Sequence, residues 1–197
     1  MKKLLPLLLA APLLTAAAHA AARDINDPLR ATYNHLSLGY VGGDHGYSAG
    51  QIDASVALGR VPYLFAVATL GGKDDVGSND VYGLGIGFRI RTTAETSLDI
   101  DLSFAQQQLD NYDNNMVGLG LGFRSALGEK VTLVARARYF ISNLEVSNNT
   151  LYAEDFAELS LAANYHFNQN FFLGLRLSKN VGQYDDLRYG LSAAFSF

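Results

Sequence analysis

Leu187-Arg-Tyr-Gly-Leu-Ser-Ala-Ala-Phe-Ser-Phe197 forms the C-terminus of the chain. Every second side chain in this stretch is apolar, and those between are small, apart from Arg188. A period of two places the apolar side chains together on one face of a β-strand. The pattern recurs about nine more times upstream, and no helical segment is evident that would cover such faces. It predicts a closed sheet whose apolar face is turned outward to lipid.

The repeats predict an all-β fold, a transmembrane antiparallel up-and-down barrel of ten strands. Most of the predicted strands have 9–12 residues, the length that a tilted strand needs to cross a bilayer core. They are Tyr33–Gly42, Gly50–Gly59, Tyr63–Leu70, Val81–Arg91, Ser97–Gln107, Met116–Ser125, Val131–Ile141, Phe156–Phe167, Phe171–Ser178 and Leu187–Phe197. The segment 63–70 is apolar on both sides, so the pattern does not assign its facing.

The connections between these strands alternate in length. Barrels with both termini in the periplasm have short turns there, longer loops outside and an even number of strands. Ten strands satisfy this rule, and eight remain an alternative if the hairpin 33–59 pairs differently. The short connections fall at 60–62, 92–96, 126–130 and 168–170, and the long ones at 43–49, 71–80, 108–115, 142–155 and 179–186.

Soluble β-sandwiches and lipocalin-like barrels also alternate, but with the apolar face inward. The C-terminal Phe197, the alternation of connections and the glycines on the second face favour the membrane barrel. These glycines form two rows, Gly83, Gly85, Gly87 and Gly118, Gly120, Gly122. Aromatic residues near the short turns are expected to form a periplasmic belt. They are Phe88, Phe123, Tyr165, Phe167, Phe171, Phe195 and Phe197.

The N-terminus has the pattern of a secretory signal peptide. A basic Met1-Lys2-Lys3 precedes an apolar run, and Ala18-His19-Ala20 fits a signal-peptidase site. The domain organisation predicted from this is a signal peptide at 1–20, a periplasmic lead-in at 21–32 and the barrel at 33–197. Export in this form places the chain in the bacterial outer membrane.

Composition excludes several kinds of function. Without Lys2 and Lys3 the chain has 13 basic and 19 acidic residues, and this excess of acid argues against a nucleic-acid partner. There is no cysteine, which excludes thiolate metal sites, thiol catalysis and disulfides. The few histidines suggest no metal cluster, and no cofactor is expected.

Charged residues on the second face are expected to point into the lumen. Arginine suits bidentate pairing with carboxylates in a confined space, and a barrel of this size is narrow. The prediction is an ion-pair network that fills the lumen, with Arg89 and Arg91 beside the strand of the two aspartates, and Arg136 and Arg138 beside that of Glu158. The alternative is a thin, anion-preferring pore. The residues in question are Arg89, Arg91, Asp99, Asp101, Arg124, Arg136, Arg138, Glu158 and Arg176.

The predicted outer loops are acidic. Solvated polar loops explain this most simply, although such a cap would also hold cations or repel anions. Loop tyrosines Tyr47, Tyr112, Tyr152 and Tyr184 are candidate anchors of an adhesion surface. The acids are Asp44, Asp74, Asp75, Asp80, Asp110, Asp113, Glu145, Glu154, Asp155, Asp185 and Asp186.

Across the mature chain, the sequence resembles the small single-domain outer-membrane β-barrel proteins of Gram-negative bacteria. The resemblance lies in the signal peptide, the repeats Gly83-Leu-Gly-Ile-Gly-Phe88 and Gly118-Leu-Gly-Leu-Gly-Phe123, and the terminal Phe197. It implies that Tyr189, Leu191, Phe195 and Phe197 act as a recognition signal for the barrel-assembly machinery. The implied surroundings are outer-membrane lipid and lipopolysaccharide.

The function expected from sequence is a structural or surface-interaction role, and a narrow passive channel is the alternative. A remote third possibility is an enzyme, because outer-membrane lipid A deacylases use a His-x-Ser pair, and His35-Leu36-Ser37 has that spacing. No carboxylate in the sequence is clearly placed to orient His35. No catalytic residue is therefore assigned.

Overall fold

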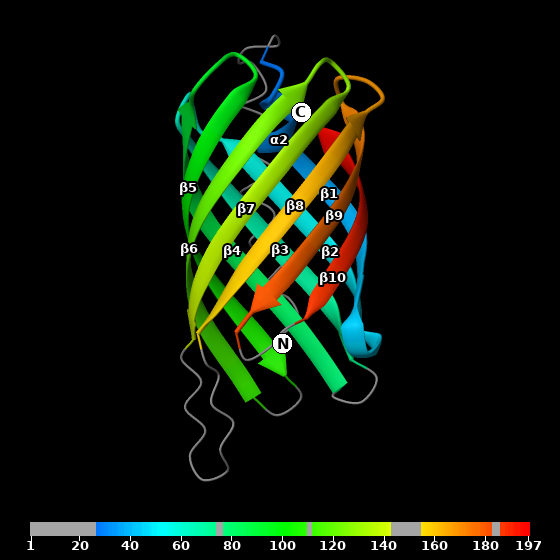
Figure 1. Cartoon of the computed structure of the whole chain (residues 1–197). Coiled ribbons are helices and arrows are strands. Elements are labelled where there is room, and N and C mark those ends of the chain that lie inside the picture. Colours follow the sequence, from blue (N-terminus) through cyan, green and yellow to red (C-terminus); the bar gives the residue numbers. More distant parts are fainter. Residues whose placement is uncertain (1–26, 74–76, 110–111, 143–154, 183–185) are drawn as a thin grey trace.

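The computed structural model describes residues 27–73, 77–109, 112–142, 155–182 and 186–197 (Figure 1). These residues form one helical turn, α2 (Arg30–Tyr33), a short 3-10 turn, η2 (Asp44–Gly46), and ten strands. The strands are β1 (His35–Gly43), β2 (Ser48–Ala57), β3 (Pro62–Lys73), β4 (Gly77–Arg91), β5 (Thr96–Leu109), β6 (Tyr112–Leu127), β7 (Val131–Ser142), β8 (Phe156–His166), β9 (Phe171–Val181) and β10 (Leu187–Ser196).

The ten strands close into a barrel in which each strand pairs antiparallel with its neighbours in the sequence. The ring is closed by β1 and β10, which run in register from His35↔Ser196 to Gly43↔Arg188. The ten-stranded barrel is thereby confirmed. The eight-stranded alternative is wrong, because β1 and β2 pair as an ordinary hairpin from His35↔Ser55 to Gly42↔Ser48.

The strand ends differ from the predicted ones at the rim with the longer loops. The strands β4, β5 and β6 have 15, 14 and 16 residues and extend beyond the apolar alternation. Polar side chains continue the pairing there, since Gln107 Nε2 donates to Asn79 Oδ1 at 2.9 Å and Asn114 Nδ2 donates to Gln107 Oε1 at 3.2 Å. Backbone pairing therefore extends beyond the apolar part of these strands.

The two ends of the barrel are distinguished by their connections. The short-turn end has the connections 58–61, 92–95, 128–130 and 167–170, and the opposite end is called the long-loop end. Figure 1 shows the C-terminus and α2 at the short-turn end, drawn at the top. The predicted signal peptide lies outside the described residues.

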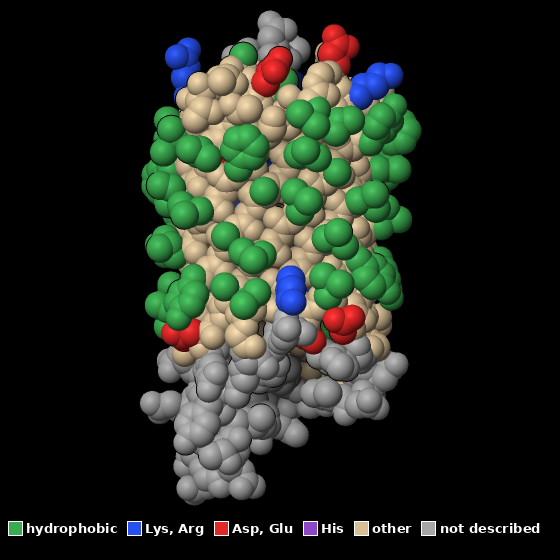
Figure 2. All heavy atoms as spheres, viewed as in Figure 1, with side chains coloured by type: hydrophobic (Ala, Val, Ile, Leu, Met, Phe, Trp, Pro, Cys, Tyr) green, Lys and Arg blue, Asp and Glu red, His purple; other side chains and the backbone are tan. Residues whose placement is uncertain are grey.

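The outer surface is apolar around the barrel wall. Figure 2 shows hydrophobic side chains over the wall, with most of the charged side chains near the two rims. Leu119 and Leu175 are 60% and 63% exposed, values that a soluble protein would rarely give to leucines in the middle of strands. Tyr189, Leu191 and Phe195 also lie on this face. Tyr165, Phe167 and Phe171 form a chain of ring contacts near the short turns, in agreement with the predicted aromatic belt.

Among the described residues, no helix is long and apolar enough to cross a membrane.

The inner face is packed most tightly where glycine faces a large side chain. On β4, an added Cβ at Gly85 would meet Phe65 Cζ at 2.4 Å, and one at Gly87 would meet Tyr63 Cζ at 2.2 Å. The rings of β3 therefore point inward into space left by these glycines. This settles the facing of residues 63–70: Tyr63 is buried, whereas Leu70 is exposed on the outside.

Candidate functional site

The lumen near the short-turn end contains a buried ion pair. Arg124 Nε lies 2.6 Å from Asp99 Oδ2, and Asp99 is only 1% exposed. The hydroxyl of Tyr33 donates to Asp99 Oδ1 at 2.6 Å. Burial raises the pKa of the Tyr33 phenol well above its usual range, so the phenol stays protonated and remains a donor. These three residues form one closed set of charge-assisted hydrogen bonds.

A second ion-pair set lies further into the lumen, around Asp101. Arg138 Nε and Nη2 lie 3.0 and 2.9 Å from Asp101 Oδ1, and Arg136 Nε lies 3.5 Å from Asp101 Oδ2. Arg138 lies opposite Glu158 in the strand register, beside that strand as predicted, but its ion pair is with Asp101. The reason is Gly120, which lies between Asp101 and Arg138 in the register and has no side chain to separate them.

At the short-turn rim, Arg89 and Arg91 lie beside the strand of the two aspartates, as predicted, but both form ion pairs with Asp27. Arg89 is opposite Asp99 in the register, yet its Nη1 pairs with Asp27 Oδ2 at 3.0 Å. Arg91 Nη2 lies 3.6 Å from Asp27 Oδ1. Asp99 is already occupied by Arg124 and Tyr33, so the rim arginines pair with the segment that precedes the barrel.

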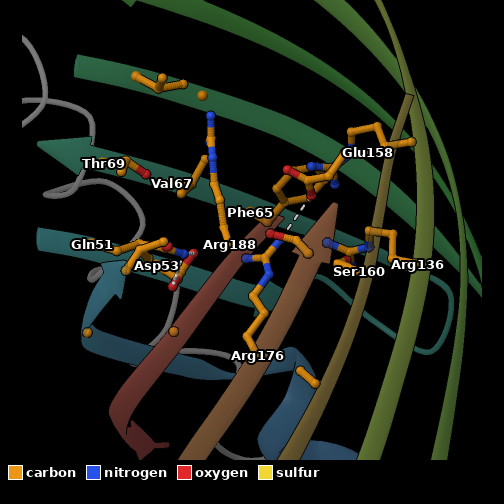
Figure 3. A pocket seen from close by; sticks show the side chains of 18 of the residues that line it. Gln51, Asp53, Phe65, Val67, Thr69, Arg136, Glu158, Ser160, Arg176 and Arg188 are labelled. Carbon is orange, nitrogen blue, oxygen red and sulfur yellow. Dashed lines mark hydrogen bonds and ion pairs between the residues drawn. The ribbon is translucent and has the colours of Figure 1, made fainter. Parts of the chain in front are cut away.

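The remaining lumen is a cavity of about 670 Å³. Its walls carry five arginines and three carboxylates: Arg124, Arg136, Arg138, Arg176, Arg188, Asp53, Glu158 and Asp186. Figure 3 shows Arg136 and Glu158 on one side of this cavity and Gln51 and Asp53 on the other. Arg176 pairs with Glu158 at 3.0 Å, while Arg188 lies 3.7 Å from Asp186. Asp53 accepts from Gln51 and Ser37.

Three of the cavity arginines have a buried nitrogen without a hydrogen bond, namely Arg136 Nε, Arg138 Nη2 and Arg188 Nε. The first two lie within ion-pair distance of Asp101, whereas Arg188 Nε has no such contact in the described part of the chain. A buried guanidinium with an unused N–H group favours an anion or water at that atom. Asp99 and Asp101 lie behind this wall and pair with three of its arginines, so the charges balance overall, but the surface that faces the cavity has more guanidinium than carboxylate groups and an unused donor on Arg188, which suits small anions.

The short-turn end is filled by residues Asp27–Asn34, here named the stopper. Leu29, Thr32 and Tyr33 are almost fully buried. Leu29 and Tyr33 pack with Tyr63 and Ala126, on β3 and β6. Sequence reasoning treated 21–32 as a lead-in and missed this role. The available signals were Asp27-Pro28, which suits a helix start, and the spacing of four between Leu29 and Tyr33.

The His35-Leu36-Ser37 motif does not form a catalytic relay in the structure. Ser37 Oγ donates to Asp53 Oδ2 at 3.1 Å. The Nδ1 atom of His35 is buried without a hydrogen-bond partner, and the ring packs against Phe172 with centroids 5.8 Å apart. The serine thus contacts the carboxylate of Asp53 rather than the histidine, so His35 is not placed to act as its general base.

Three of the five described loop acids, Asp44, Asp80 and Asp155, accept hydrogen bonds from backbone groups at the long-loop end. Asp80 accepts from Gly71 N at 3.1 Å, Asp155 accepts from Ser142 N at 3.1 Å, and Asp44 accepts from Leu187 N at 3.2 Å. Asp80 and Asp155 close the β3–β4 and β7–β8 hairpins, and Asp44 joins the turn after β1 to the start of β10. Six other predicted loop acids lie outside the described residues: Asp74, Asp75, Asp110, Glu145, Glu154 and Asp185.

Tyr47 is not available as an adhesion anchor. It is 3% exposed, and the guanidinium of Arg188 lies 4.5 Å from the centre of its ring. Tyr152 and Tyr184 lie outside the described residues. Within the described ranges, no three His, Cys, Asp or Glu residues gather in a group that would hold a metal ion.

Comparison with known proteins places this geometry in a structural class. No protein-family model and no curated protein sequence matches the chain. The KdgM porin in complex with disordered oligogalacturonate is similar with a TM-score of 0.55 and 11% identity over 83% of this chain and 99% of that chain. The chain has the fold of outer-membrane porins and channels.

Two further structures support this assignment. The NanC porin is similar with a TM-score of 0.53 and 12% identity, covering 83% of this chain and 100% of that chain. An outer membrane channel from Pseudomonas putida F1 has a TM-score of 0.55 and 9% identity, covering 83% and 94%. At such identities the similarity concerns the fold, because one barrel architecture hosts many functions.

Proposed function

We propose that this protein is a narrow, porin-like barrel of the bacterial outer membrane that passes small anionic solutes passively. The observation that carries the proposal is the cavity wall, which has five arginines and three carboxylates. A low-dielectric wall lined by one excess sign of charge concentrates ions of the opposite sign. Arginine also binds carboxylates and phosphates through its planar fork.

The size of the cavity limits the solute. About 670 Å³ is in the range of a site for one small organic molecule. One protein of similar fold was solved with oligogalacturonate, a chain of acidic sugars. That ligand belongs to the other protein, and it supports the proposal only by showing that a barrel of this type accommodates an organic anion.

A closed barrel with a structural or surface-interaction role is the second candidate. It is favoured by the buried pairs Arg124–Asp99 and Arg138–Asp101, whose carboxylates are fully shielded from solvent, and by the filled short-turn end. Under this alternative the cavity is a part of the lumen that side chains do not fill and that holds water. Its arginines then serve only to pair with Glu158, Asp101 and Asp186.

Single-channel current in a planar bilayer, with a salt gradient across it, distinguishes the two candidates. We expect discrete steps with a reversal potential that indicates anion preference. A variant with Arg136→Gln and Arg188→Gln is expected to lose much of this preference. Its control carries Arg60→Gln and Lys130→Gln, which remove the same charge from exposed positions at the short-turn end. Cation-selective steps would contradict the proposal, and so would silence that persists after the stopper is loosened.

A further inference from the structure

We propose that the stopper, Asp27–Asn34, is a gate that leaves and re-enters the short-turn end of the lumen, and that its position decides whether the barrel conducts. This inference rests on the channel function proposed above. It concerns a segment that belongs to no strand and that the barrel wall does not need for its own pairing.

The stopper crosses the lumen from wall to wall. On one side, Tyr33 packs edge-on against Tyr63 of β3, with ring centroids 5.1 Å apart. On the other side, Ala31 belongs to a buried cluster with Phe172 of β9 and Ala194 of β10. Because β3 and β9 are distant in the ring of ten strands, a segment that touches both obstructs the passage between them.

The cavity ends at the inner surface of the stopper. Thr32 of the stopper lines the cavity together with His35, Tyr63 and Arg124. At the far side the lining reaches Asn180, at the long-loop end of β9. The stopper is thus the element between the cavity and the short-turn end.

The wall residues that hold the stopper have other partners on the wall. Arg124 Nη1 donates to the carbonyl of Thr32 at 2.6 Å, but its Nε remains paired with Asp99 if the stopper leaves. Arg89 pairs with Asp27, but its Nε and Nη2 also donate to Arg60 O at 3.1 and 3.0 Å.

Arg91 is similar, since its Nε and Nη2 donate to Thr93 O and Ala94 O. Release of the stopper therefore leaves each of these arginines with a hydrogen-bond acceptor on the wall. The large cost of breaking a buried ion pair comes from a charge left buried without a partner, and release of the stopper leaves no such charge on the wall. What is lost is the packing of a few side chains, the ion pairs of Asp27 with Arg89 and Arg91, the hydrogen bond from Arg124 to Thr32 and the hydrogen bonds of Tyr33.

The stopper also has a fixed end about which it can turn. Asn34 joins it to β1, and the Oδ1 atom of Asn34 accepts from Ala57 N at 2.9 Å. Its carbonyl accepts from Phe197 N at 3.3 Å. The joint is therefore anchored to β2 and to the C-terminus, while α2 itself is a single turn with no side-chain cap.

The absence of cysteine from the sequence gives a direct test. A variant with Ala31→Cys and Ala194→Cys is treated with a short, cleavable thiol cross-linker that ties the stopper to β10. Single-channel current is recorded before cross-linking, after it, and after cleavage. We expect channel openings to disappear on cross-linking and to return on cleavage.

The matched control is Ala105→Cys with Met116→Cys, which face each other across β5 and β6 and lie inside the same cavity. Cross-linking this pair ties wall to wall and is expected to leave the openings unchanged. Equal conduction of the stopper variant before and after cross-linking would overturn the gate while leaving the channel function intact.

A loosened stopper separates failure of the gate from failure of the channel. Leu29→Ala removes a side chain that packs with Tyr33, Tyr63 and Ala126, and open probability is expected to rise by about tenfold or more. An unchanged open probability in a conducting Leu29→Ala protein overturns the gate. Silence of this variant, with heat-modifiable migration showing a folded barrel, overturns the channel function and the gate together.

Discussion

Replacing Arg138 by leucine tests whether the lumen is held together by buried ion pairs. In the native barrel, two nitrogens of Arg138 lie 3.0 and 2.9 Å from one oxygen of Asp101, and the Asp101 side chain has no solvent exposure. After the substitution, Asp101 keeps only Arg136, whose Nε is 3.5 Å away. Removing one partner of a buried pair costs about 3–5 kcal/mol. Because Arg136 remains, we expect a loss of about 2–4 kcal/mol.

The assay is urea-induced unfolding of the refolded barrel in detergent, followed by heat-modifiable gel migration and far-ultraviolet circular dichroism, since the chain has no tryptophan. Adding Asp101→Asn to Arg138→Leu removes the unpaired charge, so most of the lost stability should return. The matched control is Arg176→Leu, which breaks a pair whose arginine is 34% exposed, and it should cost no more than about 1 kcal/mol. The reasoning fails if Arg138→Leu lowers the free energy of unfolding no more than Arg176→Leu does. It also fails if adding Asp101→Asn to Arg138→Leu lowers that free energy further.

Three other predictions concern packing, lipid contact and assembly. Gly85→Ala should lower the free energy of unfolding by about 1–3 kcal/mol, because the new methyl group meets the Phe65 ring and the Leu102 carbonyl. The control is Gly50→Ala, which should be tolerated in the same urea titration because the nearest atom to its new methyl group is 4.0 Å away. Leu121→Arg, in the middle of the outer face, should cost about 2–4 kcal/mol, and Leu127→Arg at the end of β6 about 0–1 kcal/mol. Deleting Phe197 should lower the amount of folded barrel in cells more than it lowers refolding in detergent, and equal effects would contradict an assembly signal.

The features predicted from sequence are those with a period of two. Strand number, antiparallel order and the lipid-facing series follow from alternation alone, because lipid on one side and a lumen on the other sort side chains strictly. β3 escaped assignment because its inward side chains are also apolar. They fit the lumen only because Gly83, Gly85 and Gly87 lie opposite them in the register. The pattern within β3 alone therefore does not show which side faces inward.

The lumen residues were predicted as a set, but their partners were not. Parity places Arg138 and Asp101 inside, yet the contact between them passes over Gly120 to the strand beyond. A long arginine side chain can reach carboxylates on more than one neighbouring strand, and the sequence does not show which of them it pairs with. The stopper was missed for another reason. A helix of four residues has no period to detect, and its apolar residues are few.

The half-filled lumen follows from where the glycines are. On β4 and β6 they make room for the rings of β3 and the carboxylates of β5, so the lumen is filled where these side chains lie, while other residues of the same strands line the cavity. The inward positions of β1, β9 and β10 include Gly39, Gly174 and Gly190, but no large side chain of a neighbouring strand occupies the space they leave, and all three line the cavity. The strands alone therefore fill only part of the lumen. The chain supplies the seal from outside the sheet, as the stopper, and a seal that is separate from the sheet can be removed without unpairing a single strand.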